Sequence, residues 1–187
     1  RVMLVPTDLI CYALVGANGA GKSTLIRCIT HIIMPDSGNI HIMGEPLSQK
    51  HIRYIGYMPE ERGLYKKIRV GEHLLYLARL KGLSKKDSTE KLKYWLHKFD
   101  ILSWENKNIE DLSKGMQQKI QFIAAVITRP QLLILDEPMT GLDPINADII
   151  KDEILELCSQ GSTVLLSTHR MEAVEELCQE IALIHKG

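Results

Sequence analysis

Short apolar runs alternate along the chain with longer segments in which apolar residues recur every three or four positions. The longer segments predict helices, among them residues 23–33 and 116–127. The alternation predicts an α/β fold, in which helices flank a mainly parallel sheet. The short runs predict the strands of that sheet, at residues 10–15, 39–43, 53–58, 132–135, 163–167 and 181–184.

The stretch from residue 63 to residue 115 has a different character. Val70, Leu74 and Leu77 recur at helical spacing, and Ser84 followed by Asp87 resembles a capping box that opens a second helix. No strand pattern occurs in this stretch, so we expect a small all-helical subdomain inserted into the α/β core. The expected division is residues 1–62 and 116–187 for the core, 63–115 for the helical subdomain and 1–187 for the single domain.

Composition argues against several classes of protein. The formal net charge is zero, which gives no electrostatic support for a nucleic-acid partner. No apolar run approaches the roughly 18–20 residues that a membrane span needs, and no secretory signal opens the chain. The cysteines stand in apolar contexts without a C-x-x-C pair, which is typical of buried free thiols in a reducing cytoplasm. They are Cys11, Cys28, Cys158 and Cys178.

Residues 16–24 match the phosphate-binding pattern G-x-x-x-x-G-K-[ST]. A predicted strand precedes this loop and a predicted helix follows it, so backbone N–H groups and the positive end of the helix dipole would converge on one anion. Lys22 would reach the β- and γ-phosphates, and the Ser23 hydroxyl would ligate Mg²⁺. The alternative is a glycine-rich turn without a ligand, which the flanking strand and helix disfavour. The expected binding residues are Gly16, Asn18, Gly19, Ala20, Gly21, Lys22, Ser23 and Thr24.

An acidic pair, Asp136 and Glu137, directly follows the predicted strand at 132–135. Carboxylates at the carboxyl end of a central strand lie where open α/β sheets bind ligands. We expect Asp136 to hold Mg²⁺ through water and Glu137 to polarise the water that attacks the γ-phosphate. Such a pair can also be two solvated turn residues, but its place downstream of a phosphate-binding loop favours catalysis.

Five segments together resemble the ATP-binding subunit of ABC transporters, in order and in spacing. The resemblance covers nearly the whole chain. It implies a head-to-tail dimer that sandwiches two ATPs, each bound by the phosphate loop of one subunit and the signature segment of the other. The segments are Gly16 to Thr24, Leu112 to Met116, Leu132 to Pro138, Gly141 to Asp143, and Thr168 with His169.

The resemblance also implies roles for single residues. Ser113 and Gly115 would contact the γ-phosphate in trans, whereas His169 would contact the γ-phosphate and the attacking water in cis. Asp143 would couple the two nucleotide sites across the dimer interface. The residues by themselves leave two alternatives open: Ser113 can be a plain N-cap, and His169 can be a histidine that caps the next helix. The implied catalytic set is Glu137, His169 and Lys22.

The sequence departs from the family pattern at three places. Lys114 and Met116 replace a glycine and the glutamine of the signature, a form that resembles a subgroup of bacterial exporters including sodium-extruding and drug-export ATPases. Glu60 replaces the usual Q-loop glutamine, and its carboxylate would ligate Mg²⁺ or water. Both ends are expected to be incomplete: upstream antiparallel strands with an adenine-stacking aromatic residue, and a segment after Gly187, are missing relative to the family.

The sequence therefore predicts a cytoplasmic ATPase subunit, peripheral on the inner face of the membrane, that binds ATP and Mg²⁺. It would form a homodimer or heterodimer and power transport by an integral-membrane subunit on a separate chain, with export implied by the subgroup. Residues 60–67 and the helix from Val70 would contact that partner, and no nucleic-acid partner is expected. The first alternative is a soluble ABC-type ATPase in DNA repair, chromosome structure or cluster assembly. The others are a P-loop kinase or GTPase, and a catalytically silent nucleotide-binding module.

Overall fold

The computed structural model describes residues 11–61, 63–65 and 67–185. Within these residues, a five-stranded sheet has the order β4-β5-β6-β1-β7, and every neighbouring pair of strands is parallel. Parallel neighbours require crossover connections, which the helices supply. The predicted α/β fold is therefore confirmed. The strands are β1 (Cys11–Val15), β4 (Ile55–Met58), β5 (Leu132–Asp136), β6 (Thr163–Ser167) and β7 (Glu180–Leu183).

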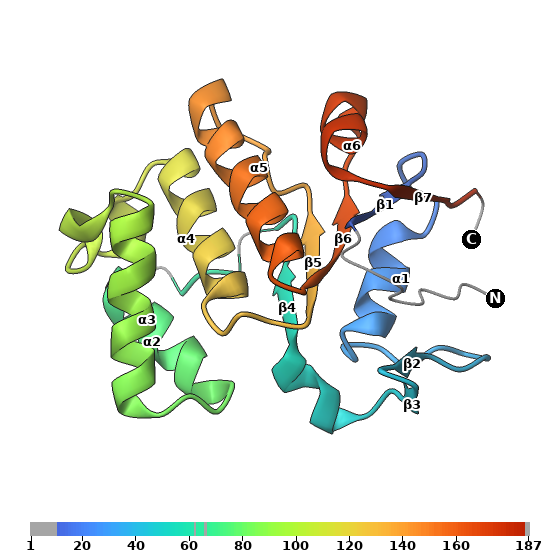
Figure 1. The fold of residues 1–187 in the computed structure, drawn as a ribbon, viewed down its shortest axis with the longest axis horizontal. Helices are drawn as coiled ribbons and strands as arrows, with labels where there is room; N and C mark the ends of the chain where they lie inside the picture. The colour runs from blue at the N-terminus through green and yellow to red at the C-terminus, as the bar shows by residue number, and fades with distance from the viewer. Residues whose placement is uncertain (1–10, 62, 66, 186–187) are drawn as a thin grey trace.

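Helices surround the strands and extend beyond them at one end. In Figure 1, α2 and α3 form the left end of the molecule, α4 and α5 lie between them and β5, and α1 lies to the right of β6. The α-helices are α1 (Lys22–Ile29), α2 (Val70–Leu80), α3 (Lys85–Lys98), α4 (Lys114–Val126), α5 (Pro144–Ser159) and α6 (Met171–Leu177).

Two predicted elements are shorter in the structure than in the sequence pattern. The strand expected at 39–43 is only β2 (His41–Ile42), because Met43 and Gly44 both have positive φ and turn the chain into the antiparallel β3 (Glu45–Pro46). The first helix ends at Ile29 instead of residue 33, because His31 has a left-handed φ of 59°.

Other predicted boundaries shift by one or two residues. The 3₁₀-helix η1 (Gln49–Tyr54) takes up the start of the strand expected at 53–58. Helix α4 begins at Lys114, two residues before the predicted start, because Ser113 is its N-cap and accepts a hydrogen bond from the Met116 backbone N–H. Strand β7 begins at Glu180, one residue early, and residue 10 of the first predicted strand lies outside the described residues.

The segment predicted to be helical contains α2, α3 and two 3₁₀ turns, η2 (Leu102–Trp104) and η3 (Ile109–Asp111). Among its described residues there is no strand, only an isolated bridge between Arg69 and Asn108. Ser84 accepts a hydrogen bond from the Asp87 backbone, as the capping pattern predicts. The limits of the helical subdomain at residues 63 and 115 stay a prediction.

Aromatic packing joins this helical segment to α4. Trp95 is 1% exposed, and its ring centroid lies 6.1 Å from that of Phe99, which lies 5.9 Å from that of Phe122 on α4. Each ring removes a large apolar area from water, so the segment shares one core with the helix that follows it. Helix α4 is thereby held on one side by the helical segment, and β4 lies against it on the other.

The cysteines are free thiols, as expected, and only Cys178 is partly exposed. They are less scattered in space than in sequence, since Cys11 and Cys178 place their sulfur atoms 3.3 Å apart. Among the described residues, none of the helices has both the length and the apolar character that crossing a membrane requires.

Candidate active site

The phosphate-binding loop connects β1 to α1 with a backbone that favours glycine. Gly19 and Gly21 have φ of 78° and 105°, which side chains rarely adopt. Gly16 is needed for space, because a Cβ there would stand 2.5 Å from the Ile184 carbonyl oxygen. These constraints bring the chain from the buried strand end directly into the first turn of α1.

The Lys22 side chain folds back over this loop. Its Nζ donates hydrogen bonds to the carbonyls of Gly16 at 2.7 Å and Ala17 at 3.2 Å. The ammonium group is thus held beside the start of α1, where the helix dipole is positive and the first N–H groups have no partner within the helix. Ser23 and Thr24 are exposed in that first turn. The loop has the geometry and the charge that bind a phosphate chain.

The acidic pair lies at the same edge of the sheet, at the carboxyl end of β5. Asp136 is the last residue of the strand and is 5% exposed. Burial raises the pKa of Asp136, and the neighbouring Glu137 carboxylate adds to the rise, whereas the Lys22 ammonium lowers it. The charge of the phosphate-binding loop therefore acts on this carboxylate, although the two are more than 100 positions apart in the sequence.

Glu137 is held in one position by a set of hydrogen bonds. Its backbone has a left-handed φ of 52°, which the N–H bond to the Ser167 carbonyl at 2.8 Å supports. Its Oε1 accepts from the His169 backbone N–H at 2.9 Å and lies 2.8 Å from His169 Nδ1, and its Oε2 accepts from the Thr168 hydroxyl at 3.2 Å. The His169 side chain is 75% exposed, whereas that of Glu137 is 11% exposed. The histidine therefore covers the carboxylate and faces solvent.

The oxygen donors at this edge fit a magnesium ion. Mg²⁺ prefers carboxylate, hydroxyl, water and phosphate oxygens, and it usually binds through one or two protein groups plus substrate phosphates. Asp136 supplies a carboxylate from the end of β5, and Ser23 supplies a hydroxyl from the first turn of α1. No cluster of three or more His, Cys, Asp or Glu side chains suited to a metal occurs in the described ranges, so the phosphates would have to complete the coordination. Glu60 is exposed just after β4.

The predicted signature residues lie apart from the phosphate-binding loop of the same chain. Ser113 caps α4, its hydroxyl accepting from the Met116 N–H at 3.3 Å, and Figure 1 shows α4 and α1 on opposite sides of β5 and β6. Asp143 caps α5: its carboxylate accepts hydrogen bonds from the side-chain amide and the backbone N–H of Asn146, and these bonds lower the pKa of Asp143. Gly115 lies close to the Gly141 carbonyl, since a Cβ there would be 3.4 Å from it. Ser113 and Asp143 are both exposed.

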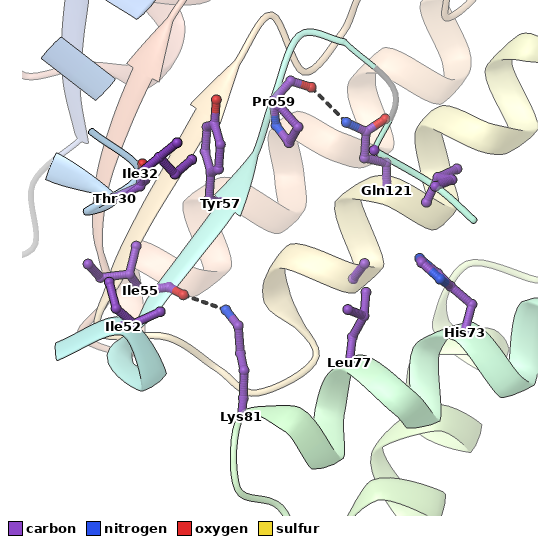
Figure 2. A pocket seen from close by; sticks show the side chains of 13 residues that line it. Thr30, Ile32, Ile52, Ile55, Tyr57, Pro59, His73, Leu77, Lys81 and Gln121 are labelled. Atoms are coloured by element: carbon purple, nitrogen blue, oxygen red, sulfur yellow. Dashed lines mark hydrogen bonds between the residues drawn. The ribbon is translucent and has the colours of Figure 1, made fainter. Parts of the chain in front are cut away.

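Two glutamines of α4 contribute contacts that the sequence reasoning missed. The Gln118 amide donates to the carbonyls of Glu137 at 3.3 Å and Pro138 at 3.0 Å. The Gln121 amide donates to the carbonyls of Pro59 at 2.6 Å and Glu61 at 3.3 Å, and Figure 2 shows the first of these bonds. Helix α4 therefore holds both the loop that carries Glu137 and the loop that carries Glu60. The sequence signal for these contacts was the presence of two glutamines among the apolar residues of a helix predicted to be buried.

Strand order, phosphate-binding loop and acidic strand end together define a P-loop nucleotide-binding fold. Residues 10–140 match the ABC transporter family. A solved ATP-binding subunit of an ABC transporter superposes with a TM-score of 0.89 at 34% identity, over 96% of this chain and 76% of that chain. The protein belongs to the ABC transporter family, and its resemblance to the ATP-binding subunits is confirmed.

Two relatives found by sequence are described as ATP-binding proteins. An uncharacterized ABC transporter ATP-binding protein of Alkalihalophilus pseudofirmus is 49% identical over 93% of this chain. A Nod factor export ATP-binding protein I of a Rhizobium species is 36% identical over 95% of this chain. The chain spans 65% and 59% of the length of these two relatives.

Proposed function

We propose that this chain is the ATP-hydrolysing part of a transporter. The observation that carries the proposal is the meeting of three loops at one sheet edge: the loop of Lys22, the carboxylates that end β5, and His169 after β6. Adjacent parallel strands place these loops side by side. Family membership supports ATP as the nucleotide, as does the description of the relatives as ATP-binding proteins.

The chemistry follows from the positions of the side chains. Lys22 would bind the β- and γ-phosphates and stabilise the negative charge that develops on the transferred group. Glu137 would orient the attacking water and accept its proton, with His169 and Thr168 holding the carboxylate in place. Asp136 and Ser23 would hold Mg²⁺, which supplies charge neutralisation on the phosphate oxygens when bound.

The exposed signature residues support a dimer as the working form. Ser113, Gly115 and Asp143 lie at or next to helix starts that face solvent in the single chain, where a second subunit could present its nucleotide. A helix N-terminus favours a phosphate through its dipole and free N–H groups. In this proposal each ATP lies between the Lys22 loop of one subunit and the Ser113 cap of the other, and closure around two ATPs is the force-producing step.

The partner in this proposal is an integral-membrane transporter subunit on a separate chain. The chain would then work at the cytoplasmic face of the membrane, as a peripheral subunit. Similarity to a protein described as an export ATP-binding protein supports export as the direction. The surface predicted to contact the partner, residues 60–67 and the start of α2, includes residues 62 and 66, which lie outside the described residues.

The test is the Glu137→Gln variant of the full-length protein with Mg-ATP. This change keeps the size of the side chain and removes the base, so ATP binding should persist while turnover falls by about 10²-fold or more. Sedimentation should then show a stable dimer that dissociates when ATP is removed. The Lys22→Ala variant is the control, because it should lose nucleotide binding and remain a monomer.

Hydrolysis of ATP by Glu137→Gln at the normal rate would show that Glu137 is not the base. A variant that binds Mg-ATP but stays monomeric at saturation would overturn the sandwich dimer. Absence of ATP binding by the unaltered protein would overturn the function as a whole.

A further inference from the structure

Three free thiols meet in the core, at the edge of the sheet where its parallel strands begin. Cys11 starts β1, Cys158 is the second-last residue of α5, and Cys178 directly follows α6. All three lie in or against one apolar cluster. The Sγ atoms of Cys11 and Cys178 are 3.3 Å apart, although the two residues are 167 positions apart in the sequence. The fold therefore creates a thiol pair that the sequence does not indicate.

The backbone holds Cys11 and Cys178 side by side. The Gln179 N–H donates to the Cys11 carbonyl at 3.1 Å, and the Cys11 N–H donates to the side-chain Oε1 of Gln179 at 2.9 Å. Beyond these bonds β1 and β7 continue as a parallel pair. Because a disulfide has an S–S distance of about 2.05 Å, the two sulfur atoms need to approach by only about 1 Å.

The thiols differ in access and in acidity. Cys178 is partly exposed, whereas Cys11 and Cys158 are buried, so a small oxidant meets Cys178 first. The hydrogen bond with Cys11 lowers the pKa of Cys178, and burial opposes this shift. Hydrogen bonds with the Cys158 and Cys178 thiols, together with burial, raise the pKa of Cys11. Since the thiolate is the reactive form, Cys178 is the thiol that attacks an oxidant.

We propose that Cys178 and Cys11 form a reversible disulfide when the protein meets a hydroperoxide. The Cys178 thiolate attacks the hydroxyl oxygen of the peroxide, the O–O bond breaks, and Cys178 becomes a sulfenic acid while the other oxygen leaves as an anion. The Cys11 sulfur then attacks the Cys178 sulfur, the S–O bond breaks, and the hydroxyl group leaves as water with the Cys11 proton. In total, two electrons pass from the two thiols to the peroxide.

A reducing dithiol reverses the reaction. Its thiolate attacks the disulfide, a mixed disulfide forms, and the second thiol of the reductant displaces it, so that both cysteines return as thiols. Disulfides in a reducing compartment are usually transient and redox-sensing. A disulfide of this kind agrees with the free thiols that the structure shows, which are its reduced state.

The thiol pair lies at the opposite edge of the sheet from the nucleotide site. Cys11 is the first residue of β1, and the phosphate-binding loop follows the other end of that strand at Val15. Helix α6 begins two residues after His169 and has Cys178 at its far end. The disulfide would fix β1 to the connection between α6 and β7 without reaching the phosphates. We therefore expect the oxidised protein to bind nucleotide as the reduced protein does.

Peptide mapping of the full-length protein after treatment with hydrogen peroxide tests the proposal. Mass spectrometry without reduction should find one linked pair of peptides, which contain Cys11 and Cys178 and together have lost two hydrogens. A cross-link that closes so long a loop restricts the unfolded chain, so Tm should rise by about 5 °C or more. A thiol reductant should abolish both effects.

Cys178→Ala should lose the linked peptides and the rise in Tm. Cys28→Ala is the matched control and should keep both, because Cys28 is buried on α1, and Figure 1 shows α1 and α6 on opposite sides of β1. Cys158→Ala should also keep both. Far-UV circular dichroism equal to that of the unaltered protein shows that each variant is folded.

Removal of both neighbouring thiols tests the order of the two steps. In the double variant Cys11→Ala with Cys158→Ala, the sulfenic acid of Cys178 has no nearby thiol to react with among the described residues. It should be trapped by the 1,3-diketone dimedone. The unaltered protein should give at least tenfold less of this adduct, because Cys11 consumes the sulfenic acid.

Peroxide treatment that leaves Cys11 and Cys178 as free thiols would overturn the inference, and so would a disulfide found only between Cys11 and Cys158. A dimedone adduct on Cys11 instead of Cys178 would contradict the order of the steps. None of these results bears on ATP hydrolysis. Loss of ATP binding by the unaltered, reduced protein would remove the proposed function and leave the disulfide standing.

Discussion

Glu137 and His169 form a pair in which one carboxylate oxygen takes two contacts from the same residue. The backbone N–H of His169 donates to Oε1 of Glu137 at 2.9 Å, and its ring Nδ1 lies 2.8 Å from the same oxygen. The backbone contact does not need the histidine side chain, whereas the ring contact does. Mutation can therefore separate holding the carboxylate from contact with the ligand.

The His169→Ala variant should lower kcat by about 10²-fold, because the ring no longer orients Glu137 or reaches the γ-phosphate. The double variant with Glu137→Gln should turn over no more slowly than the worse single variant, since residues that act as one unit are not additive. Single-turnover hydrolysis measures all three variants. Fully additive losses would show that the two residues act independently.

The Asp136→Asn variant should be more stable than the unaltered protein at neutral pH. Burial raises the folded pKa of Asp136 above its ordinary value of 3.8, so the folded state holds the proton more tightly. Stability is then lost as the pH rises through the window above 3.8, and asparagine removes that loss. Each kcal/mol gained would raise Tm by about 2–4 °C in a domain of this size.

Asp143→Asn is the matched control for this measurement. Hydrogen bonds from Asn146 lower the pKa of Asp143, so its contribution to stability has the opposite sign and is lost as the pH falls. Urea unfolding at several pH values compares the two variants. Stabilisation by Asp143→Asn, or a loss of stability in Asp136→Asn at neutral pH, would contradict the electrostatic account.

Acid should destabilise the protein through His73. Burial lowers the folded pKa of this histidine to about 4 from 6.5, so the unfolded state binds the proton more readily between these values. Stability is therefore lost as the pH falls from about 6.5 to about 4, by up to about 3 kcal/mol. His73→Leu should remove this part of the pH dependence. Unfolding curves of both proteins at pH 7 and pH 5 measure this difference. If the prediction is wrong, the free energy of unfolding falls by the same amount between these pH values in both proteins.

The Gln121→Leu variant should weaken the Glu60 loop. Without the amide, the partly buried carbonyls of Pro59 and Glu61 lose their donor, at a cost of about 0.5–1.5 kcal/mol for each hydrogen bond. Gln117→Leu is the control on the same helix, because its amide bonds to Ile109 and Leu112, away from that loop. Hydrogen exchange of the backbone amides of residues 60 and 61 should rise only in Gln121→Leu. Equal exchange in both variants would show that Gln121 does not hold the loop.

The sequence was most informative where a pattern is local. The strand ends of β5 and β6 and the phosphate-binding loop follow from apolar runs and glycine spacing, and they lie where these patterns predict. The hairpin of β2 and β3 was not predicted, because it depends on positive φ at Met43 and Gly44. Met43 carries no sequence signal for that conformation.

The contacts of α4 could not be predicted because they join distant positions. Gln121 bonds to Pro59 and Glu61, which lie 62 and 60 positions earlier in the sequence. The register of α4 against β4 decides which carbonyls Gln121 meets. The Glu137 loop has the same limit, since Gln118, Thr168 and Ser167 reach it from α4 and from the end of β6. The sequence predicted a catalytic role for Glu137 but not the groups that hold its side chain in place.

Gln118 and Gln121 are three residues apart, which is nearly one turn of α4, and each donates hydrogen bonds to a different loop. A rigid helix cannot shift at one end of this turn while the other stays still. Any rotation of α4 would therefore shift the backbone of Glu137 and the backbone of Pro59, just after β4, together. A force that acts on the helical end of the molecule would then reach the Glu137 loop through less than one turn of α4.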